Sequence, residues 1–229
     1  SDFGRRYIFR SANYGTLHSY VQGQKKLGEV ETKQLYRQIV ELVAFCHAAG
    51  IVVRDLKLRK FAFVDAQRKQ LCLSDVTDLV ICADADDDRL LDRHGCPAYV
   101  SPEILDVDRK AYSGQASDIW SLGVLLFVML LGRYPFYDST PSGLFVKIRQ
   151  ARVAVPENQG LSALVRGLIQ GLLRKDPGER PTAGELLTTP WLQSRTAPVP
   201  QRPRGFRSRI ARLNAAAEGD HMVPDVPLN

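Results

Sequence analysis

The sequence predicts a mainly α-helical domain of the α+β class, on the strength of three patterns. Between Thr32 and Ala49 apolar residues recur every three or four positions, which indicates a helix with one buried face. Residues 118–131 are apolar nearly all round, which predicts a central helix covered by others. Short β-type runs at 62–64 and 71–73 flank a polar turn and predict a strand pair.

The remaining elements follow in chain order. A turn and a short helix are expected over 15–22, and an irregular stretch over 78–102. Further helices are expected at 144–151, 161–174 and 183–191, the first two with amphipathic spacing. Beyond Ser194 Pro, Arg and Ala become dense, which is typical of a flexible tail over 194–229.

Composition argues against several classes of protein. The 229 residues are 45% hydrophobic, enough for one globular domain plus a tail, and the net charge of +6 is spread along the chain. No nucleic-acid recognition motif is present, and no apolar run approaches the roughly 20 residues of a membrane span, the longest being 122–131. The four cysteines lack metal-ligand spacing, so we expect no metal site and a reducing compartment.

Asp55 and Lys57 are candidate catalytic residues, because they lie between the first long helix and the strand pair. On a tight loop a carboxylate can accept a hydroxyl proton, and a nearby lysine can neutralise a transferring phosphoryl group. Taken alone, an Arg-Asp-Leu-Lys run is equally compatible with a surface ion cluster.

Three later segments, in the same order, resemble parts of the protein kinase large lobe. They are "GCPAYVSPE" (95–103), "SDIWSLGVLLFVMLLGRYPF" (117–136) and "DPGERPTAGELLTTPWL" (176–192). The resemblance, which runs from about residue 7 to 192, implies a protein-kinase-like fold. It also implies that Glu103 pairs with Arg180, that Asp118 accepts backbone hydrogen bonds from the catalytic loop, and that Trp120 packs in the core.

The same resemblance implies that catalysis has been lost. Lys60 stands where a kinase has the Asn that binds the second Mg²⁺, yet an ammonium has no lone pair to offer a metal. It would repel the ion by roughly 8 kcal/mol at 4 Å and an effective dielectric near 20. The Asp-Phe-Gly triplet is best matched by 75–77, with Asp78 as a rival alignment. We therefore expect Asp55, Lys57 and Asp75 to be vestigial, with no resident cofactor and at most weak binding of ATP and Mg²⁺.

The segment between Asp78 and Tyr99 contains no Ser, Thr or Tyr, so phosphorylation cannot switch it there. The acidic run 84–88 has two interpretations. It mimics a phosphate and pairs with Arg54 or other local basic side chains, or it is a solvated acidic loop.

Little of a small lobe is expected in this chain. Only residues 7–9 resemble its last strand, so 1–10 would be a remnant of that lobe and the hinge. Residues 11–193 would form the large lobe, and we expect the chain to be a truncation or a partial gene product.

Two segments resemble the Tribbles pseudokinases more closely than kinases at large. "VRDLKLRKF" (53–61) and "RHGCPAYVSPEIL" (93–105) are similar to that family's "LRDLKLRKF" and "KHGCPAYVSPEIL", and the first match includes the unusual Lys60. The family usually has Ser-Leu-Glu where this chain has Asp-Val-Thr at 75–77, which leaves weak nucleotide binding more open.

The tail carries a second resemblance to this family. Asp220, His221, Met222, Val223, Pro224 and Asp225 look like the peptide by which Tribbles proteins recruit an E3 ubiquitin ligase of the constitutive-photomorphogenesis type. Pro224 presets an extended chain, which lowers the ordering cost of binding. A docking motif for MAP-kinase kinases is less complete. Pro190, Trp191 and Leu192 match part of it, but they are equally explained by packing of a helix end.

Three functions remain open. The leading one is a nuclear and cytoplasmic adaptor that brings a substrate, such as a CCAAT/enhancer-binding transcription factor, to the ligase. By resemblance, its other partners would be MAP-kinase kinases or the kinase Akt. The alternatives are a weak Ser/Thr kinase using Asp55 as base and Asp75 for Mg²⁺, and an inhibitor that sequesters a kinase without any ubiquitin step.

Overall fold

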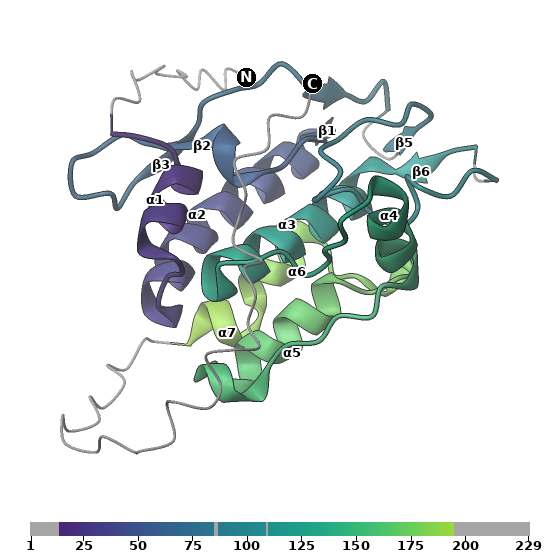
Figure 1. The fold of residues 1–229 in the computed structure, drawn as a ribbon. Helices are drawn as coiled ribbons and strands as arrows, with labels where there is room; N and C mark the ends of the chain where they lie inside the picture. The colour runs from purple at the N-terminus through teal and green to yellow at the C-terminus, as the bar shows by residue number, and fades with distance from the viewer. Residues whose placement is uncertain (1–13, 85–86, 109, 195–229) are drawn as a thin grey trace, which may run out of the picture.

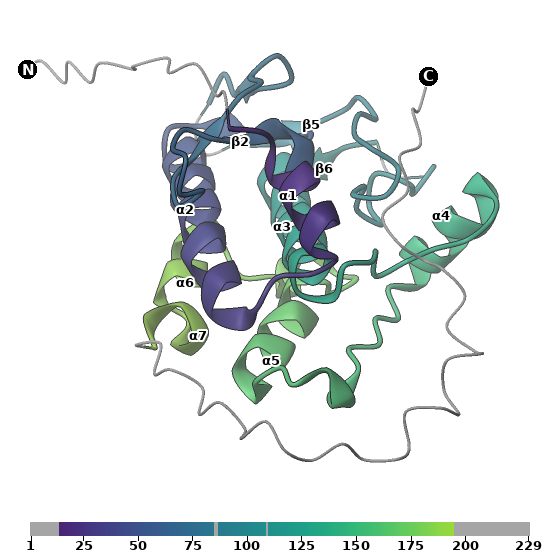
Figure 2. The ribbon, with the colours of Figure 1, turned by 60° about the vertical axis from the view of Figure 1, so that its left-hand side comes forward.

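The computed structural model describes residues 14–84, 87–108 and 110–194, which form a mainly helical body (Figure 1). Two long helices run through it, α2 (Glu29–Ala48) and α3 (Gly114–Leu131), and they pack against each other (Figure 2). The remaining helices are α1 (Leu17–Gln24), α4 (Pro141–Gln150), α5 (Ala163–Leu172), α6 (Ala183–Thr188) and α7 (Pro190–Gln193). The predicted mainly α fold is confirmed.

Helix α3 is the centre of the core, because nearly every side chain along it is buried. It begins where Ser113 accepts a hydrogen bond from the backbone N–H of Ala116, and it ends at Gly132 in a left-handed conformation (φ 68°). A Cβ at Gly132 would lie 1.9 Å from the carbonyl oxygen of Lys25, so only glycine fits this close approach between chain segments.

Six short strands form three antiparallel pairs at one end of the body, opposite α5 and α7 (Figure 1). Strand β1 (Ile51–Val52) pairs with β4 (Val80–Ile81), and β2 (Phe61–Phe63) pairs with β3 (Leu71–Leu73). Strand β5 (Arg89–Leu90) pairs with β6 (Tyr112–Ser113). The loop 53–60, which ends in the 3-10 helix η1 (Leu58–Lys60), is therefore held between β1 and β2.

Several element boundaries differ from the sequence expectations. Helix α2 begins three residues earlier than expected, and the stretch 78–102 contains β4 and β5. The helix expected at 183–191 is divided at Thr189, which has extended backbone (ψ 145°) because the residue before a proline disfavours the helical region. The strand expected at 7–9 and the tail lie outside the described residues.

Within the described residues one helix, α3, is long and apolar enough to cross a membrane. It is longer than the apolar run of 122–131 noted in the sequence. However, 83% of it is buried inside the protein, as expected of the core helix of a folded lobe.

Candidate functional site

The loop that carries the candidate catalytic residues is anchored by Asp118 on α3. One oxygen of this buried carboxylate accepts a hydrogen bond from the N–H of Val53 at 2.7 Å, and the other from the N–H of Arg54 at 2.8 Å. The imidazole Nε2 of His47 lies 2.9 Å from the same carboxylate. Asp118 thus makes the backbone contacts that the resemblance implies, and they hold Arg54 in its positive-φ conformation (φ 70°).

Asp55 is buried, and both of its carboxylate oxygens already have partners. Oδ2 accepts from Nζ of Lys57 at 2.5 Å, and Oδ1 accepts from the backbone N–H of Cys96 at 3.2 Å. Burial opposes the charge of Lys57, but the hydrogen bond and charge of Asp55 outweigh it and raise the pKa of Lys57. The two candidate catalytic residues therefore form an ion pair with each other.

Lys60 is buried, and its ammonium sits among carboxylates. It forms an ion pair with Asp78 and lies 3.7 Å from an oxygen of Asp55 and 3.7 Å from an oxygen of Asp75. The residues here do not fit Mg²⁺, because the ammonium occupies the position among the oxygen donors that a cation would need. Over the described part of the chain, no group of three His, Cys, Asp or Glu residues is suited to holding a metal.

Asp78, the rival in the alignment, is the main partner of Lys60. The hydrogen bond from Lys60 lowers the pKa of Asp78, and its second oxygen lies 2.8 Å from Nε2 of His94. Asp75, in contrast, has a side chain that is 45% exposed, and it accepts hydrogen bonds from the N–H and hydroxyl of Thr77. Those bonds, rather than Lys60, are the main cause that lowers the pKa of Asp75.

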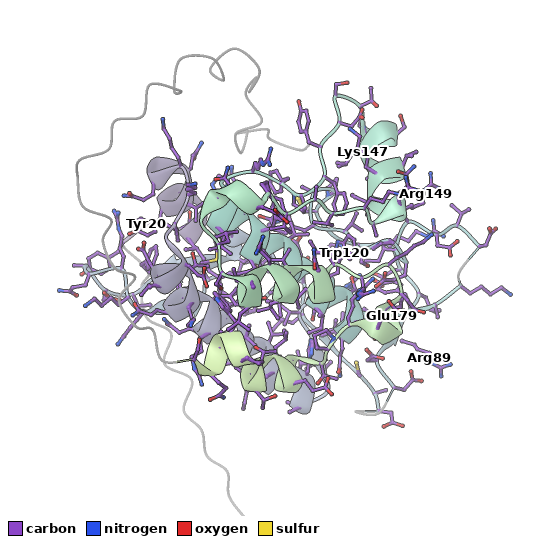
Figure 3. The ribbon with its side chains drawn as sticks, turned by 90° about the horizontal axis from the view of Figure 1, so that it is seen from below. Tyr20, Arg89, Trp120, Lys147, Arg149 and Glu179 are labelled. Carbon is purple, nitrogen blue, oxygen red and sulfur yellow. The ribbon has the colours of Figure 1, made fainter. Side chains whose placement is uncertain are left out.

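In the part of the acidic run that the structure describes, Asp87 and Asp88 make local contacts. Arg54 pairs with Asp92. Of the basic partners considered for the run, a local side chain rather than Arg54 is the one that meets Asp87. Asp87 pairs with the local Arg89, whose side chain extends from the surface (Figure 3), and Asp88 accepts from the hydroxyl of Ser113 at the start of α3. Asp92 lies just beyond the run, and only spatial proximity identifies it as the partner.

The scaffold pair Glu103 and Arg180 is in contact through two hydrogen bonds, of 2.6 and 2.8 Å. Arg180 also donates to the carbonyl oxygens of Ala116 and Arg174, and its guanidinium lies 5.1 Å from the ring centroid of Trp120. Trp120 lies at the centre of the lobe (Figure 3) and stacks on Phe136 with ring centroids 5.6 Å apart. These contacts join the segment ending at Glu103 to the C-terminal helices.

Of the residues that resemble the kinase-docking motif, Trp191 and Leu192 are buried and Pro190 is exposed. Trp191 is buried, and its indole N–H donates to Glu29 at 2.8 Å. Leu192 is buried too, and its carbonyl accepts from Arg37. The contacts of Trp191 and Leu192 favour the helix-packing interpretation of 190–192. The candidate ligase motif, 220–225, lies outside the described residues.

A groove of about 480 Å³ lies between residues 93–107 and α4 and is here called the α4 groove. No sequence pattern predicted it. Its rim carries Arg93, His94 and Arg149, and none of its described lining residues is acidic. Arg149 projects from α4 near the edge of the lobe (Figure 3). The apolar side chains of the groove are Pro97, Val100, Ile104, Leu105, Val107, Phe145 and Val146.

Comparison with known proteins gives the family. The model of the protein kinase domain matches residues 5–192. Tribbles homolog 1 of Homo sapiens is 50% identical over 190 residues, which are 83% of this chain and 50% of the relative. Tribbles homolog 2 of Bos taurus is 46% identical over 222 residues (97% and 61%), and Tribbles homolog 3 of Mus musculus 47% identical over 224 (96% and 58%). The chain spans about half to three fifths of the length of these relatives. It belongs to the protein kinase domain family and, within that family, to the Tribbles group.

Proposed function

We propose that this chain is the protein-binding lobe and tail of a pseudokinase adaptor that brings a substrate protein to an E3 ubiquitin ligase. The observation that carries the proposal is the ammonium of Lys60 among the carboxylates of Asp55, Asp75 and Asp78. A lobe of this kind lacks a binding site for the Mg²⁺ that phosphoryl transfer requires. We infer that the protein has no resident cofactor and binds ATP with Mg²⁺ weakly at most.

The α4 groove is the surface we assign to the substrate. Its floor is apolar and its rim is basic, which suits a short peptide with apolar side chains flanked by acidic ones. Val107 is 71% exposed and Val146 43%, so apolar area is available to a partner. By family resemblance the substrate is a bZIP transcription factor of the CCAAT/enhancer-binding type, encountered in the nucleus and cytoplasm.

The tail segment 220–225 is assigned to the ligase of the constitutive-photomorphogenesis type. Val223 and Pro224 would fill an apolar pocket on its β-propeller, with Asp220 and Asp225 at a basic rim. Binding both partners at once raises the effective concentration of substrate lysines near the ligase, as expected for linked binding sites. MAP-kinase kinases or the kinase Akt would be further partners in signalling.

The test is ligase capture by the intact chain. Val223→Ala with Pro224→Ala should reduce capture at least about tenfold, because the pocket-filling side chains are removed. The chain offers a matched control, since a second Val-Pro pair stands at 226–227. Alanine substitution of that pair should leave capture within about twofold of wild type. Equal loss from both double variants would contradict the motif assignment.

The two alternatives remain distinct in experiment. A weak kinase would phosphorylate a protein in a metal-dependent reaction that Asp55→Asn abolishes. Its geometry is unfavourable here, because Asp55 is bonded to Lys57 and Asp75 is engaged in its own turn. A sequestering inhibitor would still inhibit its target kinase after deletion of residues 218–229, whereas the adaptor would lose ligase-dependent degradation.

A further inference from the structure

We propose that Lys60 is a built-in cation that positions the α4 groove, acting through Asp78 and His94. The inference deepens the proposed function and rests on it wherever the groove is said to hold a substrate. Lys60 is then a positioning residue, and the former metal position controls the shape of a protein-binding surface.

The first link joins the catalytic loop to the segment after β3. The ammonium of Lys60 pairs with Asp78, while its backbone carbonyl accepts from both the N–H (2.8 Å) and the hydroxyl (3.0 Å) of Ser74. Its own N–H donates to the carbonyl oxygen of Lys57 at 3.1 Å. Lys60 therefore ties residues 74–78 to the loop with its main chain and its side chain together.

The second link runs from Asp78 to the groove. One oxygen of Asp78 meets Lys60, and the other lies 2.8 Å from Nε2 of His94, which lines the α4 groove. Two residues further on, the backbone N–H of Cys96 donates to Asp55, another carboxylate beside Lys60. The rim segment 94–96 is thus held at two points by carboxylates that share one cation.

The charge of Lys60 is what makes this arrangement possible. Three carboxylates directed at one place repel one another unless a cation lies between them. Asp55 has a second cation in Lys57. Asp78 is in direct contact with Lys60 and, when protonated, the cationic His94, while Lys57 acts on it only through its charge. Because Lys60 is part of the chain, it compensates this charge whether or not a metal or nucleotide is present.

Hydrogen exchange on the intact chain tests the proposal directly. Asp78→Asn should speed amide exchange in residues 92–97 at least about threefold, because the link to His94 loses its charged acceptor. Asp75→Asn is the matched control. Asp75 lies as near to Lys60 as Asp55 does, but its side chain contacts Thr77 and Lys60 whereas that of Asp78 meets His94. Amide exchange at 92–97 in Asp75→Asn should therefore stay as in wild type. Lys60→Met should give the largest increase.

One further variant, His94→Ala, together with Asp78→Asn, keeps the test valid should Lys60→Met fail to fold. His94→Ala changes a side chain that is 44% exposed, so it should leave the fold intact while freeing the same rim segment. Wild-type exchange rates at 92–97 in both Asp78→Asn and His94→Ala would overturn the proposal.

A binding readout separates this inference from the proposed function. A labelled CCAAT/enhancer-binding protein should bind Asp78→Asn about fivefold to tenfold more weakly than wild type, while ligase capture through 220–225 is unchanged. If exchange at 92–97 rises but this binding does not weaken, Lys60 positions the rim as inferred and the substrate assignment of the groove fails. If neither changes, the positioning role fails and the adaptor assignment stands.

Discussion

Replacing Glu103 with Gln should destabilise the lobe by about 3 kcal/mol, the lower end of the range for breaking a buried ion pair. The side chains of Arg180 and Glu103 are 0% and 2% exposed, so the substitution leaves a guanidinium charge with little access to water. Arg180 keeps carbonyl acceptors on Ala116 and Arg174 and its contact with the Trp120 ring, which is why the upper end of the range is not expected. For a domain of this size the melting temperature should fall by about 6–12 °C.

Urea unfolding followed by tryptophan fluorescence measures this effect, since Trp120 and Trp191 are both buried. The matched control is Glu41→Gln, which breaks an exposed pair with Arg37 whose side chains are 51% and 41% exposed. That pair is worth about 0.3–0.5 kcal/mol. If Glu103→Gln lies within about 1 kcal/mol of the control, the buried pair does not hold the segment as argued.

Three further predictions concern packing, acid stability and metal. Gly132→Ala should destabilise the lobe by about 1–3 kcal/mol, because the φ of Gly132 is 68° and a Cβ would meet the carbonyl of Lys25. Gly171 lies in α5 with open space around it, so Gly171→Ala should stabilise the lobe by about 0.5–1 kcal/mol in the same urea assay. Lys60 lowers the pKa of Asp78 in the folded state. The stability that this interaction contributes is therefore fully present above the unfolded pKa of about 3.9, and it is lost as the pH falls through the lower pKa of the folded state. Urea midpoints measured between about pH 5 and pH 3 should therefore fall less in Asp78→Asn than in wild type. MgATP should leave the melting temperature of wild type unchanged by scanning fluorimetry, and a rise that Asp75→Ala abolishes would favour the weak-kinase alternative.

Much of the fold could be predicted from periodicity, because the long helices bury one face or all of it. The apolar run of α3 indicated its central position, yet its start at Gly114 depends on the side chain of Ser113, which no apolar pattern reports. The helix break at Thr189 was missed because apolar spacing does not report it. Apolar spacing continues through it, while the backbone restriction imposed by Pro190 ends the helix.

The chemistry of the site and the contacts of Asp118 could be predicted, but the ion pairs around Lys60 and Arg54 could not. The side-chain type at Lys60 alone excludes it as a metal ligand, because an ammonium has no lone pair whatever its surroundings. Which carboxylate faces the ammonium depends on the turn at 75–77, and the structure selects Asp78 over Asp75. Likewise Arg54 meets Asp92 rather than the denser acidic run. The α4 groove joins segments about 40 residues apart, a distance that local patterns do not bridge.

A cation that is part of the chain behaves differently from one that binds. A bound metal stabilises its site by mass action, so the order of the surrounding carboxylates depends on the metal and ligand concentrations. Lys60 is present at one copy per chain under every condition, and it is buried where it meets Asp78. A kinase needs nucleotide and metal ions to enter and leave its site in each cycle. A protein that presents a fixed binding surface instead keeps that surface ordered when the cation holding it cannot dissociate. In the proposed adaptor, the replacement that puts Lys60 at the magnesium-binding position is also the one that keeps the rim at His94 in place, so weak metal binding and a persistent binding surface would both follow from one side chain.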